Sequence, residues 1–307
     1  MPSFRARMIN AMLRLTVKPL WRPGLTVDAI RQHTARTDAR LGRRRVDCAT
    51  ESITIDGIPA KWYGASGLAE RNGTLLYLHG GAWCVHLPGM YGAFAARLSA
   101  ATGMRVLLVD YRLAPEHPFP AAVDDCLAVY RALVAGPTGR PRVIAGDSAG
   151  GNLSLVTLMR ARDARLPLPA CAVLLSPATD VSMSGPSIRY NAKADPMFST
   201  GAGDLLPDLY CTGLERTLPL ISPLHGDWTG LPPLYFLAGS TEMLLDDSVR
   251  AHDRAQQAGT SSRIDVWPHM PHVFPLFPMV PEATLAIRDI VAFIDEHARE
   301  VASSGLL

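Results

Sequence analysis

A serine between two glycines is the feature of this sequence with the clearest chemical meaning. Residues 146–150 read Gly-Asp-Ser-Ala-Gly, after an apolar run at 142–145 and before a helix-like stretch at 152–162. A strand, a tight turn and a helix with serine at the turn form a nucleophile elbow. A glycine-rich turn that happens to hold a serine is the alternative, and the flanking elements favour catalysis. Ser148 is therefore the candidate nucleophile, which still requires a base and oxyanion donors.

Backbone donors are predicted from an earlier glycine pair. An apolar run at 75–78 is followed by His-Gly-Gly-Ala-Trp. Glycines directly after a strand let N–H groups face a ligand, and acyl transfer needs such donors for the oxyanion. We predict that the backbone N–H groups of Gly80, Gly81 and Ala149 form this hole. His79 is interpreted as a structural residue that holds the loop.

The general base is predicted from a late loop that contains two histidines. His269 and His272 follow the apolar stretch 264–267, and a serine hydrolase places its base on a loop after a late strand. We predict His272, because the apolar residues at 273–277 can fix its ring. His269 is the alternative, and either residue could instead only satisfy loop carbonyls.

The acid that orients the base is predicted after the strand that precedes this loop. Glu242 is the first carboxylate after that strand, and Asp246 and Asp247 follow about one helical turn later. Acidic residues in the first turn of a helix are common, so we predict Glu242. The order Ser148, Glu242, His272 is the order expected for an α/β-hydrolase.

Three stretches together resemble the bacterial hormone-sensitive lipase-like carboxylesterases, the family IV esterases of the α/β-hydrolase superfamily. They are 79–83, 110–125 (beginning Asp-Tyr-Arg-Leu-Ala-Pro-Glu-His-Pro) and 146–152, and the resemblance runs from about Val46 to the C-terminus. It implies a serine carboxylesterase that hydrolyses short- to medium-chain acyl esters through an acyl-enzyme. It also implies that no metal or cofactor is needed, and that 110–120 is mainly scaffold.

Two positions depart from the family pattern. Ala82 stands where the family often has a third glycine, and Glu242 stands where many members have aspartate. Alanine keeps the backbone donor, and glutamate can orient a histidine with one extra methylene.

The rest of the chain predicts an α/β fold, because apolar runs alternate with helix-like stretches. We expect the α/β-hydrolase fold, with a mostly parallel sheet flanked by helices and a helical cap. The predicted strands are 75–78, 105–109, 142–145, 172–175, 234–237 and 264–267. The predicted helices are 93–101, 121–134, 153–163, 247–258 and 282–299. The candidate catalytic residues then lie at the C-terminal edge of the sheet.

Residues 1–45 are predicted to be an N-terminal cap segment of a catalytic domain spanning 46–307. An apolar helical face is formed by Phe4, Met8, Met12 and Leu15, and the basic residues nearby are Arg5, Arg7, Arg14 and Lys18. A helix that lays its apolar face over the active site, an interfacial membrane helix and an arginine-rich transit peptide all fit this pattern. The family resemblance supports the cap.

A second cap element is expected at about 183–215. This stretch is rich in Gly, Pro and Ser and lies between two predicted strands. We expect it to supply apolar walls for the substrate, and ordinary packing within the cap is the alternative. The candidate lining residues are Met197, Phe198, Leu205, Leu206 and Tyr210.

Composition limits the remaining possibilities. The 307 residues, 48% of them hydrophobic, suit one large domain, and a net charge of +2 gives no reason to expect nucleic acid. No uncharged apolar run reaches the length of a membrane span, so stable membrane insertion is not expected. Five cysteines without a Cys-x-x-Cys pair support neither a zinc nor a redox motif. Their odd number, without a signal peptide, predicts reduced thiols and a cytoplasmic location.

Two rival functions remain open at this point. The same catalytic residues could hydrolyse a lactone or an N-acyl bond, which the sequence cannot separate from an ester. A non-catalytic ligand-binding protein on the same fold is the other possibility, and the intact serine, histidine and oxyanion loop argue against it. A small ester is the expected substrate, and a homodimer through the sheet edge is plausible.

Overall fold

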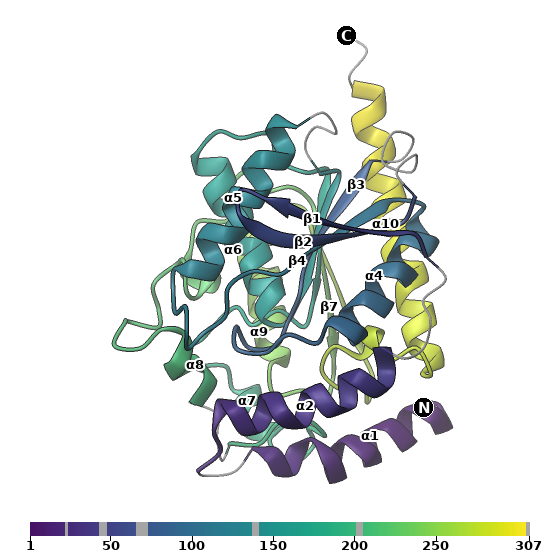
Figure 1. Ribbon diagram of the computed structural model, residues 1–307, viewed down its shortest axis with the longest axis vertical. Coiled ribbons are helices and arrows are strands. Elements are labelled where there is room, and N and C mark those ends of the chain that lie inside the picture. The colour runs from purple at the N-terminus through teal and green to yellow at the C-terminus, as the bar shows by residue number, and fades with distance from the viewer. Residues whose placement is uncertain (22–23, 43–47, 66–72, 137–140, 201–204, 305–307) are drawn as a thin grey trace.

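The computed structural model describes residues 1–21, 24–42, 48–65, 73–136, 141–200 and 205–304, and their core is one eight-stranded sheet (Figure 1). The strand order is β1-β2-β4-β3-β5-β6-β7-β8. All pairs from β4 to β8 are parallel, whereas β1 and β2 pair antiparallel with their neighbours. The strands are β1 (Thr50–Ile55), β2 (Ile58–Tyr63), β3 (Thr74–Leu78), β4 (Arg105–Val109), β5 (Val143–Asp147), β6 (Cys171–Leu175), β7 (Leu234–Gly239) and β8 (Ser262–Trp267).

Helices cover both faces of this sheet and create two hydrophobic cores (Figure 1). Along β3, Leu76 and Leu78 face one core while Leu75 and Tyr77 face the other. Strands buried on both faces have continuous apolar sequences, which explains why these runs are conspicuous. The first core is covered by α5 (Ala121–Ala135), α6 (Ala149–Asp163) and α9 (Leu245–Gln257), and the second by α4 (Pro88–Thr102) and α10 (Pro281–Ser304).

The predicted mostly parallel sheet flanked by helices is confirmed, and each predicted strand overlaps an observed one. The sequence analysis missed β1 and β2. Both strands lie toward the antiparallel end of the sheet, and β1 has no buried residue. The exposed β1 therefore has little apolar signal. In β2 four of the six residues are buried, but Pro59 and Lys61 interrupt its apolar sequence.

The N-terminal segment forms two helices that lie side by side across one end of the molecule (Figure 1). These are α1 (Phe4–Thr16) and α2 (Val27–Gly42), joined in part by the short η1 (Lys18–Leu20). The predicted boundary between residues 45 and 46 lies outside the described residues. No helix in the described ranges combines the length and apolarity needed to cross a bilayer.

The orientation of α1 differs from the expectation that its apolar face covers the active site. Its buried side chains are Ala6, Ile9 and Leu13. The predicted apolar face points to solvent, and the exposed fractions are 67% for Phe4, 56% for Met8, 47% for Met12 and 78% for Leu15. The Ser3 hydroxyl donates to Glu282 at 2.8 Å and the Asn10 amide to the His269 carbonyl at 3.0 Å. These bonds and the packing of the second apolar face fix the rotation of the helix.

The stretch predicted as a second cap element lies against the N-terminal segment. It contains α7 (Ser187–Tyr190) and α8 (Leu205–Tyr210), and its residues 201–204 lie outside the described ranges. Arg14 donates to the carbonyl of Ala194 at 2.7 Å, and Lys18 donates to the carbonyls of Ala192 and Asp195 at 2.7 and 2.6 Å. The remaining short elements of the fold are η3 (Pro223–His225) and η4 (Phe274–Leu276).

An aspartate on α2 caps the start of α4. The Asp38 carboxylate accepts the N–H groups of Gly89 and Met90 at 2.8 and 2.7 Å, and Asp38 is 7% exposed. No local side chain caps α4, whose N-cap position is Leu87. Asp38 therefore links the N-terminal segment to the catalytic domain through two otherwise unpaired donors.

We expect Asp38→Ala to destabilise the protein by about 1–2 kcal/mol, because two partly buried N–H groups lose their acceptor. In a chain of this size that is a fall of roughly 2–6 °C in Tm, measured by circular dichroism. The exposed Arg36 on the same helix offers the control Arg36→Ala. Equal Tm values for Asp38→Ala and Arg36→Ala would show that the cap contributes nothing.

Candidate active site

Ser148 lies on a strained turn between β5 and α6. Its backbone angles are φ 51° and ψ −119°, a region that non-glycine residues rarely adopt. A Cβ on Gly150 would lie 2.0 Å from the Leu78 carbonyl oxygen, and one on Gly146 would lie 2.3 Å from the Gly150 oxygen. The two glycines of the motif are therefore required by close approach of main chains. Strain of this kind persists where the surrounding structure enforces it, and it is common at catalytic residues.

The predicted base and acid form a buried pair. Nδ1 of His272 lies 2.5 Å from Oε2 of Glu242, and their side chains are 3% and 0% exposed. The other carboxylate oxygen of Glu242 accepts the Ser176 hydroxyl at 3.0 Å and the Gly239 N–H at 2.5 Å. Within the described part of the chain, Nε2 of His272 is buried and has no hydrogen-bond partner. The second ring nitrogen is thus left available for a proton from a nucleophile.

Nearby carboxylates set the direction in which the pKa of His272 is shifted. Burial lowers the pKa of His272, but the hydrogen bond and charge of Glu242, with Asp195 and Asp147 farther away, outweigh burial and raise the pKa above its ordinary value. A base with a raised pKa accepts a proton more readily.

The rival residues considered for these two roles lie elsewhere. His269 is exposed, and its N–H donates to the Ser240 hydroxyl at 2.8 Å. The carboxylates of Asp246 and Asp247 accept hydrogen bonds from residues in 180–190. Of the candidate bases and acids, only His272 and Glu242 are therefore paired with each other.

The predicted oxyanion hole requires one correction. The N–H of Gly80 is buried and donates to Oδ1 of Asp147 at 2.9 Å, so it is not available to a substrate. The next two residues, Gly81 and Ala82, have φ of 106° and 51°. Among the described residues, no acceptor is found for the N–H groups of Gly81, Ala82 and Ala149. Gly80, which was predicted as a donor, therefore has an occupied N–H, whereas Gly81, Ala82 and Ala149 offer unpaired ones within the described chain.

The strand register explains why the prediction of Gly80 as an oxyanion donor is wrong. Leu78 on β3 pairs with Gly146 on β5, so the chain after Leu78 runs beside Asp147. A buried carboxylate at that point must find donors, and the N–H of Gly80, two residues after Leu78, lies within hydrogen-bond distance of it. The aspartate in Gly-Asp-Ser was the signal that could have corrected the prediction.

The carboxylate of Asp147 accepts hydrogen bonds from three donors. The hydroxyls of Tyr77 and Tyr91 donate to it at 2.8 and 3.0 Å, in addition to the Gly80 N–H. Burial raises the pKa of Asp147 to about 6, although these three donors pull it back down. The carboxylate joins the nucleophile turn to the loop that carries Gly81 and Ala82.

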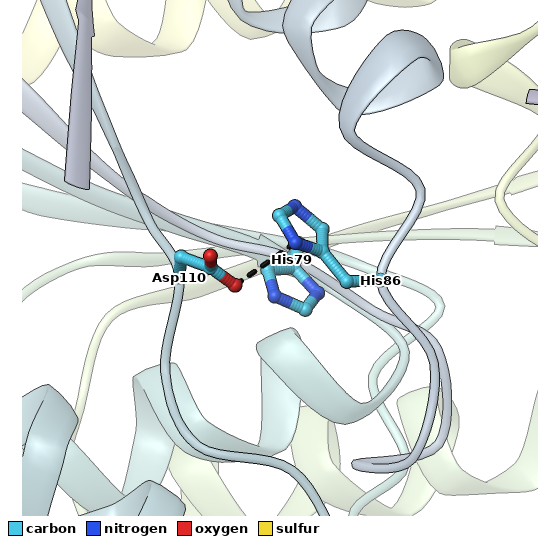
Figure 2. Close-up of side chains that lie close together, drawn as sticks. All are labelled: His79, His86 and Asp110. Atoms are coloured by element: carbon cyan, nitrogen blue, oxygen red, sulfur yellow. Dashed lines mark ion pairs between the residues drawn. The ribbon is translucent and has the colours of Figure 1, made fainter. Parts of the chain in front are cut away.

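The histidine at the start of that loop lies in a stack of rings (Figure 2). The His79 ring is 4.3 Å from the rings of both His86 and Tyr111. His86 Nδ1 lies 2.9 Å from Asp110 (Figure 2). His79 Nδ1 lies 2.7 Å from the Gly80 carbonyl, which assigns the ring proton to Nδ1. Burial, with the neighbouring His86, lowers the pKa of His79 to about 3. His79 is thus a neutral ring that contacts the loop and not the cavity.

An apolar cavity of about 90 Å³ lies beside Ser148 and Ala82. Its walls come from the N-terminal segment, from 183–215 and from the residues after Glu242, and include Trp21, Met183, Phe198, Leu206, Met243 and Leu244. The Phe198 ring packs edge-on against His272 at 5.0 Å and against Trp21 at 5.2 Å. Of the lining residues expected in 183–215, Phe198 and Leu206 reach the cavity. Tyr210 instead stacks on Trp83 at 4.3 Å.

Comparison with known proteins agrees with this geometry. Residues 75–276 match a family model described as the alpha/beta hydrolase fold. An acetyl-hydrolase of Streptomyces hygroscopicus is 39% identical over 79% of this chain and 81% of its own, and an esterase of Acinetobacter venetianus is 36% identical over 92% and 94%. The crystal structure of an esterase from the bacterial hormone-sensitive lipase (HSL) family superposes with a TM-score of 0.88 at 36% identity, covering 97% and 99% of the two chains.

These similarities extend over the whole fold and include the strand, turn and helix around Ser148 and the loop that carries His272. The chain belongs to the bacterial hormone-sensitive lipase-like esterases of the α/β-hydrolase superfamily, and it is a carboxylic ester hydrolase.

Proposed function

We propose that Ser148, His272 and Glu242 form the catalytic triad of a carboxylesterase that acts on short-chain acyl esters. The observation that carries this proposal is the buried His272–Glu242 pair, whose free Nε2 is at the same sheet edge as the strained Ser148 turn. Glu242 holds the ring in the tautomer with its proton on Nδ1, so that Nε2 carries the lone pair.

The reaction proceeds in two halves. Ser148 Oγ attacks the ester carbonyl carbon and transfers its proton to His272 Nε2. The tetrahedral intermediate then collapses, the C–O bond to the alcohol breaks, and the imidazolium returns the proton to the departing alkoxide. Water attacks the acyl-enzyme by the same route, and the acid is released as Ser148 recovers its proton. Glu242 stabilises the imidazolium in both halves.

The oxyanion is stabilised by the N–H groups of Gly81, Ala82 and Ala149. Their lack of other acceptors in the described chain supports this role, and the N-terminus of α6 adds a favourable dipole. Asp147 acts as a positioning residue, because its bond to Gly80 fixes the loop immediately before the first two donors.

A short acyl group is favoured by the cavity. The volume of about 90 Å³ is lined by Trp21, Phe198 and Met183, and a space of this size holds a few methylenes. The name acetyl-hydrolase for the Streptomyces relative supports the same substrate class. Residues 1–45 and 183–215 would then act together as the cap that limits acyl length.

The test is hydrolysis of p-nitrophenyl esters from acetate to palmitate. We expect kcat/KM to be highest at acetate or butyrate, because longer chains do not fit the cavity, and to fall by at least about 10⁴-fold in Ser148→Ala. Ser52→Ala, at an exposed serine of β1, is the control. A folded wild type that cleaves only lactones or amides would contradict the ester assignment.

The pH profile distinguishes the acid from a merely structural glutamate. His272 must be neutral to act as base, so activity falls as the pH drops below its pKa, which Glu242 raises. Glu242→Gln removes that charge. We expect kcat to fall by roughly 10²–10⁴-fold and the acidic limb of kcat/KM to move to lower pH. An unmoved limb would show that Glu242 is not the partner of the base.

A third prediction concerns Asp147. We expect Asp147→Ala to lower kcat by about 10²-fold with little change in KM, because a displaced donor loop weakens only transition-state binding. Asp147→Asn keeps an acceptor for Gly80 and should recover most of the activity. A KM effect equal to the kcat effect would argue for simple loss of structure.

The same residue gives a pH signature in stability. Burial raises the pKa of Asp147 to about 6. The free energy of unfolding of the wild type therefore falls by up to roughly 3 kcal/mol between pH 4 and 7, as this carboxyl group ionises. The free energy of unfolding of Asp147→Asn, relative to wild type, should therefore increase as the pH rises through this window. Denaturant titrations at pH 4, 5, 6 and 7 measure it, and a flat difference would contradict the raised pKa.

A further inference from the structure

The outer face of α1 carries an apolar stripe that nothing in the described chain covers. Phe4, Met8, Met12 and Leu15 are all exposed, and the buried residues Ala6, Ile9 and Leu13 lie on the opposite side of the helix. In Figure 1, α1 is the outermost element at its end of the molecule. Soluble proteins rarely leave a contiguous row of large apolar side chains in water, and such rows mark interaction surfaces.

The stripe is bordered by positive charge on both sides. At 100° per residue, Arg5 lies on one flank and Arg7 and Arg14 on the other, and all three are exposed. The first 27 residues contain five basic residues and no aspartate or glutamate. An apolar stripe between arginines is the pattern of a helix that lies in a bilayer interface, where the apolar face enters the acyl region and the cations meet headgroups.

The helix is already held in the orientation that this contact needs. Ser3 and Asn10 bond to Glu282 and to the His269 carbonyl, and the inner face is packed into the second core. The stripe is thus presented without unfolding or rearrangement of α1. A rigid, preorganised face loses little conformational entropy on binding.

We propose that the exposed face of α1 binds anionic lipid surfaces and holds the enzyme on them peripherally. A second copy of the chain fits the face less well. In a twofold pair the two stripes would meet with their arginine flanks facing each other, and like charges across an interface are unfavourable. An anionic bilayer complements both the apolar stripe and the arginines.

The position of α1 gives this contact a consequence for catalysis, which rests on the proposed function. The chain runs from α1 through η1 to Trp21, which lines the cavity beside Ser148. Arg14 and Lys18 bond to the carbonyls of 192–195, next to Phe198. A docked enzyme therefore has its cap at the lipid surface, where esters that partition into lipid are concentrated.

The experiment is co-sedimentation of the full chain with vesicles of phosphatidylcholine alone and with one third phosphatidylglycerol. We expect binding to the anionic vesicles at low ionic strength and its loss in about 0.5 M salt, where surface charges are screened. Met8→Gln with Met12→Gln should weaken binding at least about tenfold, and Arg5→Gln with Arg7→Gln about fivefold per arginine.

Matched controls come from distant exposed positions. Val266 on β8 is 41% exposed and Arg131 on α5 is exposed, so Val266→Gln and Arg131→Gln should bind like wild type. Hydrolysis of a soluble ester reports that the α1 variants are folded, and it separates failure of this proposal from failure of the esterase assignment.

Three results would overturn the proposal. They are absence of wild-type binding to anionic vesicles at low salt, equal binding by wild type and both α1 double variants, and a solution mass that halves in Met8→Gln with Met12→Gln. The last result would assign the face to a second copy of the chain.

Discussion

The site depends on main chains that approach one another more closely than any side chain would permit. The carbonyl of Leu78 occupies the place that a Cβ on Gly150 would need, so the end of β3 lies directly against the start of α6. That contact brings the loop with Gly81 and Ala82 beside the turn of Ser148. The strained turn of Ser148 lies two residues before Gly150, directly beside this contact.

Buried carboxylates then hold the surrounding loops. Asp147, Glu242 and Asp195 are each buried, and each accepts backbone N–H groups from loops at the sheet edge. Asp195 binds the N–H groups of Met197, Phe198 and Met243, and burial raises its pKa despite these donors. A hydrogen-bonded carboxylate fixes a loop more strictly than apolar packing does. Together the three negative groups favour a protonated His272.

The parallel sheet and the pairing of His272 with Glu242 could be predicted because short buried strands and motif spacing are local signals. The role of Gly80 could not, because it depends on which N–H a carboxylate in another strand captures. The orientation of α1 could not be predicted from the sequence either. The helix has two apolar faces, and its packing in the second core and its bonds to Glu282 and His269 decide which one is buried. Ser176, which joins the acid to the base loop, carries no motif and becomes visible only when β6 is placed between β5 and β7.

The attachment of the N-terminal segment has a consequence for how such enzymes can change over evolution. Asn10, Arg14, Lys18 and Arg31 all donate to backbone carbonyls of the body. A carbonyl is present whatever side chain the residue carries, so the side chains at 192–194 can be replaced without losing the bonds that hold the helices in place. The side chains of the segment that leads to Phe198 in the cavity wall are therefore free to diverge while the covering helices stay docked. In this contact the side chains can alter the substrate range, whereas the backbone carbonyls hold the helices.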